Sequence, residues 1–288
     1  MAKQAVKTVQ DEPRQHELAL PDWMKGDIGK GAENIGRDDL ETPRLKLIQA
    51  LSPELQANDE LRAGDFFHTA AEHVFRGPFR VVPLYMDKRY ILWNPRDSGG
   101  GILARADDGV HWNPPNAAFN VKLDRKDGGQ AVTWKTANTV QQSRLAEWGS
   151  TNPNDANSAP AATQMINYVF AFPDFHDLMP AVFTFQRSAV KYGRRFNTKI
   201  KTLTMSTPLF GLVFEMASFV DRNKVSQEFH SPLIKGMGRV QEEALYREYK
   251  TQHEMFAKAG LTIRDVEGLQ DEAAPDDKHL DDQDNVQY

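Results

Sequence analysis

Six basic side chains between residues 187 and 201 are the strongest sign of chemistry in the sequence, and that chemistry is the binding of anions. They are Arg187, Lys191, Arg194, Arg195, Lys199 and Lys201, and no carboxylate stands among them. Their three- and four-residue spacing predicts one cationic stripe on a helix. Like charges at this spacing repel, and an anionic partner such as a nucleic-acid backbone would offset the repulsion. A solvated surface face is the alternative interpretation.

A second segment, residues 88–93, interleaves basic and aromatic side chains. On a strand, Lys88 and Tyr90 share one face, and Arg89 and Trp93 share the other. Proteins that bind single strands need this mixture, because cations follow the phosphates while rings stack on unpaired bases. The expected stacking residues are Tyr90, Trp93 and Tyr192, with Phe196 as a further candidate, and Lys88 and Arg89 are expected to line the groove. For each ring taken singly the core is the favoured place, so the expectation depends on the cluster of rings and cations.

The segment from residue 265 to residue 288 is strongly acidic. It carries nine carboxylates against Lys278, so it contributes 1 − 9 = −8 to a net charge of −5 and leaves +3 on the rest. A segment with so many charges and so few apolar residues cannot bury enough apolar surface to offset the entropy lost on ordering. We therefore expect it to be disordered. The residues expected to recruit partners are Asp276, Asp277, Asp281, Asp282, Asp284 and Tyr288. A merely solubilising segment is the other interpretation.

Enzymatic and metal-dependent functions find no support in the residues. The absence of cysteine excludes disulfides, thiolate metal sites and cysteine nucleophiles. The eight histidines are scattered, and no nucleophile elbow, phosphate loop or metalloprotease helix is present. We therefore expect a non-enzymatic protein without cofactor or metal. The absence of a signal-peptide core and of an apolar run of about 20 residues predicts a cytoplasmic protein without membrane contact.

The elements that would position these side chains are mostly short strands. Strands are predicted at 65–68, 79–85, 89–93, 119–123, 131–134, 166–172, 181–185, 209–217 and 227–230, and helices at 188–201 and 241–259. Many short strands with a mid-chain basic helix and a C-terminal helix predict a mainly β, α+β fold built as a small closed β-barrel. The expected organisation is a flexible arm (1–40), a nucleic-acid-binding domain (41–263) and a disordered tail (264–288).

Several segments resemble proteins encoded by tailed bacteriophages, some of which are single-stranded DNA-binding proteins. They are Thr42–Ile48, Gly64–Phe67, Val82–Tyr85, Lys88–Trp93, Phe183–Phe196 and Pro208–Phe210, and the acidic tail with its terminal aromatic is similar as well. The resemblance implies an OB-type barrel that binds single strands and a tail that contacts polymerase, primase–helicase or nuclease. Relatives often carry cysteines in the stretch equivalent to Ser143–Gln164, suggesting a zinc knuckle, whereas this chain has none there.

The leading hypothesis is sequence-independent single-stranded DNA binding in phage replication or recombination, in the host bacterial cytoplasm. Phosphate contacts are assigned to Arg187, Lys191, Arg194, Arg195 and Lys199. The acidic tail would compete with DNA for this surface and recruit replication proteins, and a homo-oligomer is possible. The alternative is a virion or assembly protein whose basic helix and acidic tail make protein–protein contacts without nucleic acid.

Overall fold

The computed structural model describes residues 42–95, 98–123, 131–222 and 226–260, together with residues 23, 26, 30, 31 and 34. The chain divides into two units, Met1–Leu40 and Glu41–Tyr288. The expected tail (264–288) and nearly all of the expected arm (1–40) lie outside the described residues. The elements of the second unit are β1 (Leu45–Leu47), α1 (Glu54–Ala57), β2 (Phe66–His68), β3 (His73–Phe75), β4 (Phe79–Trp93), β5 (Ile102–Ala106), β6 (Ala118–Lys122), β7 (Ala131–Lys135), α2 (Val140–Ser143), β8 (Ala162–Ala171), β9 (Ala181–Gln186), the 3₁₀ turns η5 (Arg187–Ala189) and η6 (Leu209–Gly211), α3 (Val190–Leu203), β10 (Leu212–Arg222), β11 (Glu228–Arg239) and α4 (Glu243–Ala259).

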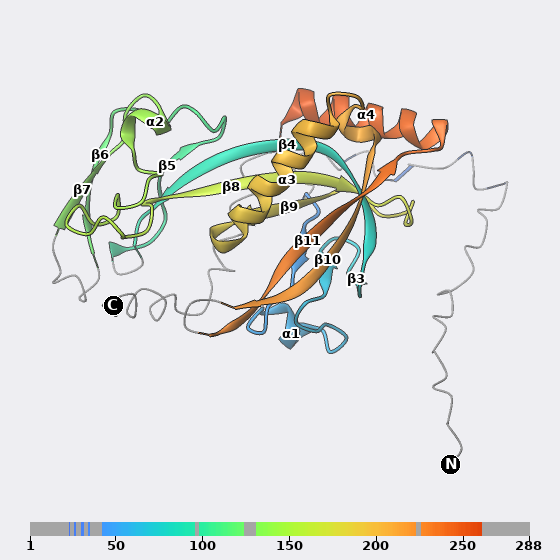
Figure 1. Cartoon of the computed structure of the whole chain (residues 1–288), viewed down its shortest axis with the longest axis horizontal. Coiled ribbons are helices and arrows are strands. Elements are labelled where there is room, and N and C mark those ends of the chain that lie inside the picture. The colour runs from blue at the N-terminus through green and yellow to red at the C-terminus, as the bar shows by residue number, and fades with distance from the viewer. Residues whose placement is uncertain are drawn as a thin grey trace, which may run out of the picture. The chain divides into compact units, whose positions relative to one another are not determined.

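The largest sheet is built around the long antiparallel ladder of β4 and β8. Its strand order is β11-β10-β4-β8-β9, and β5 pairs with the far end of β4. The two strands expected at 79–85 and 89–93 are one strand, because β4 pairs with β8 from Val82 to Leu92 with one irregularity at Pro83. Figure 1 shows β4 and β8 linking the small lobe of β5, β6, β7 and α2 to the rest of this unit.

The mixed α+β class is confirmed, but the expected OB-like barrel is wrong. The described strands form a six-stranded sheet, a three-stranded sheet of order β1-β2-β3 and the β6-β7 hairpin, and none of the three closes on itself. The two helices were predicted to within two residues at each end. The spacing of apolar residues thus predicted where the two helices lie, but it did not predict whether the edge strands of the sheet pair with each other to close a barrel.

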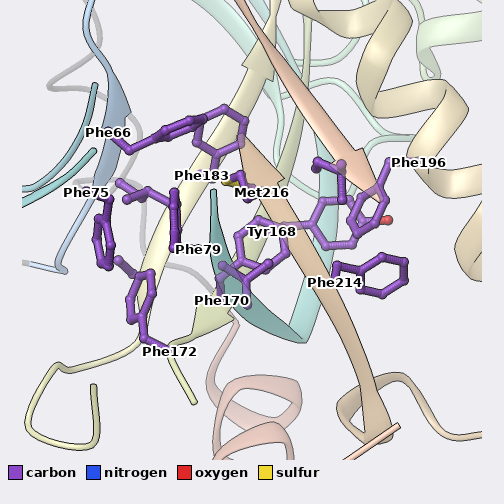
Figure 2. Packing of buried hydrophobic residues seen from close by; sticks show 14 of the residues in the cluster. Phe66, Phe75, Phe79, Tyr168, Phe170, Phe172, Phe183, Phe196, Phe214 and Met216 are labelled. Atoms are coloured by element: carbon purple, nitrogen blue, oxygen red, sulfur yellow. The ribbon is translucent and has the colours of Figure 1, made fainter. Parts of the chain in front are cut away.

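An aromatic core lies between one face of the large sheet, the three-stranded sheet and α3. Alternate residues of β8, Ile166, Tyr168 and Phe170, point into it together with Phe196 of α3. Figure 2 shows these rings packed with Phe66 of β2, Phe75 of β3 and Phe79, the first residue of β4. This packing fixes α3 to the sheet, and its charged side is left facing away.

Two other large cores lie elsewhere in the unit. The other residues of β8, Val169 and Ala171, pack on the opposite face of the sheet with Tyr249 of α4. The small lobe has its own core around Trp112 and Trp134, both at most 4% exposed. The helices α3 and α4 thus cover opposite faces of the large sheet.

The outer strand β11 is protected from pairing with other chains. The side-chain amide of Gln49 accepts from the backbone N–H of His230 at 2.8 Å and donates to its C=O at 3.0 Å. Lys199 Nζ donates to the C=O of Ile234 at 2.8 Å, and Pro232 between them has no N–H. Side chains and a proline therefore occupy positions that would otherwise template another strand.

Candidate nucleic-acid interface

The cationic helix α3 lies close against β8 and β9. At Gly193 an added Cβ would stand 2.9 Å from the Cβ and Cγ of Phe185 and 3.1 Å from Ile166. A glycine at this point therefore allows the helix to approach the sheet more closely than any other residue would. Phe196, one turn later, is buried in the aromatic core. It is thus a packing residue and not the stacking surface suggested by its place in the basic segment.

The cations of α3 differ in how they are held. Lys191 forms an ion pair with Asp221 of β10 at 3.1 Å, and the Tyr192 hydroxyl donates to the same carboxylate. The hydrogen bonds from Tyr192 and Lys191 lower the pKa of Asp221 to about 2, and the bond to Asp221 raises the pKa of Lys191. This cluster ties the start of α3 to β10, so Lys191 already has an anionic partner.

Arg194 and Arg195 are the exposed cations at the centre of the helix. Arg194 donates to the side-chain oxygen of Gln164 at 2.6 Å. The guanidinium of Arg195 lies 5.7 Å from the centre of the Tyr192 ring. Neither contact neutralises a charge, so both guanidinium groups can still attract an anion. Tyr192 itself packs against Phe219 and bears two cations over its ring, which leaves little of it for a base.

Two of the residues predicted to bind phosphate, Lys199 and Arg187, have surroundings that differ from those of Arg194 and Arg195. Lys199, although exposed, directs its ammonium group to the Ile234 carbonyl on β11. Arg187 lies in the turn before α3 with φ 50°, exposed and next to the helix start. The ammonium group of Lys199 thus already stabilises the sheet edge, and its contact with phosphate stays a prediction.

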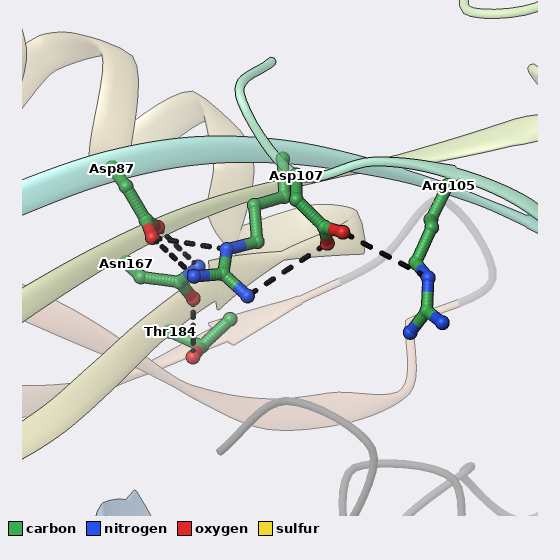
Figure 3. Close-up of polar contacts among 6 residues, drawn as sticks. Asp87, Arg105, Asp107, Asn167 and Thr184 are labelled. Atoms are coloured by element: carbon green, nitrogen blue, oxygen red, sulfur yellow. Dashed lines mark hydrogen bonds and ion pairs between the residues drawn. The ribbon is translucent and has the colours of Figure 1, made fainter. Parts of the chain in front are cut away.

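Arg89, which was expected to line a DNA groove, is buried. Its side chain is 4% exposed and donates twice to Asp87, at 2.9 and 2.7 Å. Asn167 donates to the other oxygen of Asp87 at 2.7 Å, and Thr184 donates to Asn167 at 2.7 Å (Figure 3). Burial raises the pKa of Asp87, while Arg89 opposes that rise. The network therefore holds three strands together inside the protein.

The register of β4 and β8 separates the predicted aromatic residues. Lys88 pairs with Ile166 and Tyr90 with Gln164, so both lie on the face that α3 covers. Trp93 instead packs with Ile91 and Met165 on the other face. The predicted division of segment 88–93 into two faces is confirmed. Tyr90 and Trp93 therefore lie on opposite sides of the sheet.

Lys88 and Tyr90 border an open hollow of about 390 Å³ between the end of the large sheet and the small lobe. The Lys88 ammonium lies 5.5 Å from the centre of the Tyr90 ring. Gly109, with φ 70°, brings its loop so close to the Lys88 carbonyl that a Cβ would overlap it at 2.4 Å. The other lining residues are Val110, Thr139, Val140, Gln141, Arg144, Ala146 and Glu147. Sequence analysis missed Arg144 and Gln164, because neither stands in a basic or aromatic run.

The described residues contain no group of three or more His, Asp or Glu side chains placed to hold a metal ion. No helix within those same residues is both long and apolar enough to span a bilayer. The predicted partner-binding residues Asp276, Asp277, Asp281, Asp282, Asp284 and Tyr288 lie outside the described part of the chain.

The described residues form an α+β fold with an open sheet and one helix rich in cations. Comparison with known proteins indicates where such a chain comes from. Residues 14–262 match the model of the family described as Pam3 phage gp34-like protein. The match covers most of the chain, which therefore belongs to this family of bacteriophage proteins. No curated protein and no solved structure matches the sequence.

Proposed function

We propose that this phage protein binds single-stranded DNA without sequence preference, as a non-enzymatic component of phage replication or recombination in the host cytoplasm. The observation that carries the proposal is the outer side of α3. This helix has five cations and no carboxylate, and it is fixed on the sheet by a buried aromatic core. Several cations on a rigid surface neutralise phosphates and release their counterions, which favours binding to nucleic acid of any sequence.

The contacts fall into a phosphate-binding part and a base-binding part. Arg194 and Arg195, with Arg187 nearby, are the exposed guanidinium groups for phosphates. Tyr90 and Lys88 lie on the same face of the sheet, and the hydrogen bond between Arg194 and Gln164 connects the two parts. A single strand has unpaired bases for such a ring, whereas a duplex presents mainly its backbone. This arrangement favours single-stranded over double-stranded DNA.

The acidic segment could compete with DNA for the cationic face of α3 within the same chain. Residues 265–288 carry a net charge of −8, opposite in sign to α3. We propose that this segment lies on the cationic face until DNA displaces it, and that it then contacts replication proteins. Its local concentration near α3 is set by the length of the chain between them, so competition needs no strong contact.

Fluorescence anisotropy of labelled oligo-dT tests the proposal. The protein is titrated at 50 and 300 mM salt, with unlabelled duplex of equal length as competitor. We expect tight binding at low salt, a large loss at high salt and weak competition by the duplex. Absence of binding at 50 mM salt, both for the full chain and after removal of residues 265–288, would refute DNA binding.

The second candidate function is a virion or assembly role, and exposed methionines favour it. Met205, Met237 and Met255 are 86%, 55% and 64% exposed, and flexible thioethers suit protein–protein contacts. Light scattering against protein concentration, without DNA, distinguishes this candidate. Growth of large particles under conditions in which oligo-dT does not bind would favour assembly.

A further inference from the structure

An exposed tryptophan follows directly in the chain after a residue that lines the hollow at Lys88 and Tyr90. Trp148 is 71% exposed, and it follows directly after the lining residue Glu147. The other tryptophans of the small lobe, Trp112 and Trp134, are almost completely buried. A large ring left in water gives up the free energy that burial would provide. A ligand that stacked on the ring of Trp148 would recover part of that free energy.

Trp148 is held on a rigid turn. The N–H of Glu147 donates to the carbonyl of Arg144 at 3.0 Å, and the N–H of Gly149 donates to Ser158 at 2.7 Å. The hydroxyl of Ser150 also donates to the carbonyl of Leu145, a core residue of the lobe, at 2.8 Å. The ring thus projects from an ordered backbone, so binding to it costs little ordering of the chain.

The hollow that is lined by Glu147, the chain neighbour of Trp148, has the size and the groups to bind one nucleotide. Its volume of about 390 Å³ falls within the range of small-molecule sites. Lys88 and Arg144 supply positive charge, Thr139 and Gln141 supply polar groups, and Tyr90 and Val140 supply apolar surface. Glu147 pairs with Arg144 at 2.7 Å, and Asp108 bonds to His111 next to the hollow. A phosphate would replace Glu147 as the partner of Arg144.

The hollow and α3 lie along one path on the same face of the sheet. Arg194 bonds to Gln164, Gln164 pairs across the ladder with Tyr90, and Tyr90 lines the hollow. A strand whose phosphates follow Arg195 and Arg194 would therefore reach the hollow with its next bases.

From these contacts we infer that the small lobe contains a nucleotide subsite. One unpaired base stacks on Trp148, and its phosphate is bound by Lys88 and Arg144 at the hollow. The inference rests on the proposed function and extends it, since the subsite would distinguish unpaired from paired bases whereas α3 attracts either.

The variant Trp148→Ala tests the subsite, with Trp23→Ala as the matched control because Trp23 is also exposed (77%). Loss of one stacked base should weaken oligo-dT binding about 5- to 150-fold. The salt dependence should stay unchanged, because no charge is removed. Trp148→Phe should restore much of the affinity, duplex binding should change little, and the thermal midpoint should stay near that of the wild type.

The failures of the two proposals are distinguishable. If the wild-type protein binds no oligo-dT, both are overturned. If it binds and Trp148→Ala binds equally well, the subsite is refuted while DNA binding stands. Equal weakening of single-stranded and duplex binding by Trp148→Ala would also refute the subsite, because a base-stacking ring must favour the unpaired strand. Trp23→Ala should bind like the wild type, and a matching loss in that variant would overturn the assignment to Trp148.

Discussion

Arginines of this protein have opposite roles according to their burial. Arg89 and Arg194 stand in similar basic and aromatic surroundings in the sequence. Arg89 is enclosed with Asp87, Asn167 and Thr184, whereas Arg194 is exposed and bonds a neutral amide. A buried guanidinium stabilises its acid partner, and an exposed one remains available for an anion. The acid partner of Arg89 is only two residues away, but Asn167, which binds the same carboxylate, is 80 residues from Asp87, and local sequence does not reveal that contact.

Replacement of Arg89 tests its structural role. Arg89→Ala leaves the carboxylate of Asp87 buried without its guanidinium, and the free energy of unfolding should fall by about 3–5 kcal/mol at pH 7. Urea denaturation measures this loss. Arg105→Ala is the control, because Arg105 contacts Asp107 at 3.8 Å from a more exposed position and should cost less than about 1 kcal/mol.

The penalty of Arg89→Ala should decrease as the pH falls. Burial raises the pKa of Asp87 in the folded protein, so folding favours the protonated carboxyl group. The contribution of Asp87 to the free energy of unfolding is therefore full at low pH and is lost as the pH rises through the raised pKa. Without Arg89 the carboxyl should hold its proton more strongly still. The variant and the wild type should therefore differ less at pH 4 than at pH 7, and a constant difference would contradict the assignment.

At the scale of elements, the sequence predicted the helices α3 and α4 to within two residues at each end. In α3, the buried Gly193 and Phe196, the partly buried Ile200 and the charged remainder recur with helical spacing. The strands were harder to delimit. Pro83 and the charged residues around Asp87 resemble a break in β4, yet the ladder to β8 continues through them. Likewise β11 continues through Pro232 and Gly236, because Gln49 and Lys199 bond its outer edge.

The contact between α3 and the sheet can be tested at Gly193. Gly193→Ala gains about 1 kcal/mol of helix propensity, but overpacking against Phe185 costs about 1–3 kcal/mol. We expect a net loss of about 1 kcal/mol in the free energy of unfolding, measured by urea denaturation. Thr198→Ala on the exposed side should be neutral or slightly stabilising. An increase in stability for Gly193→Ala would show that the helix lies further from the sheet.

At the scale of the whole molecule, charge is divided along the chain. The acidic segment carries −8, and the rest of the chain carries +3. The sequence predicted this division fully, because it depends on composition. It did not predict the open sheet, since closure depends on how distant strand ends meet. It also missed the hollow at Arg144, which forms between segments separated by about 50 residues.

Removal of residues 265–288 tests competition by the tail. The truncated protein should bind oligo-dT several-fold more tightly than the full chain at 50 mM salt, because the intramolecular anion is gone. The two proteins should converge at 300 mM salt, where screening weakens the competition. A full-length variant with the tail carboxylates changed to amides is the control and should behave like the truncation. Equal affinities at low salt would refute the competition.

The most direct measurement of the central claim is the salt dependence of oligo-dT affinity for the wild type and for Arg194→Ala with Arg195→Ala. Each phosphate contact adds about 0.7 to the slope of log K against log salt for a single strand. The double variant should therefore bind more weakly and with a slope lower by about 1.4. The matched control, Arg247→Ala with Lys250→Ala, removes two cations from α4 on the opposite face of the sheet. If α3 is the interface, the control keeps the wild-type slope; an unchanged slope for the α3 variant would contradict the account.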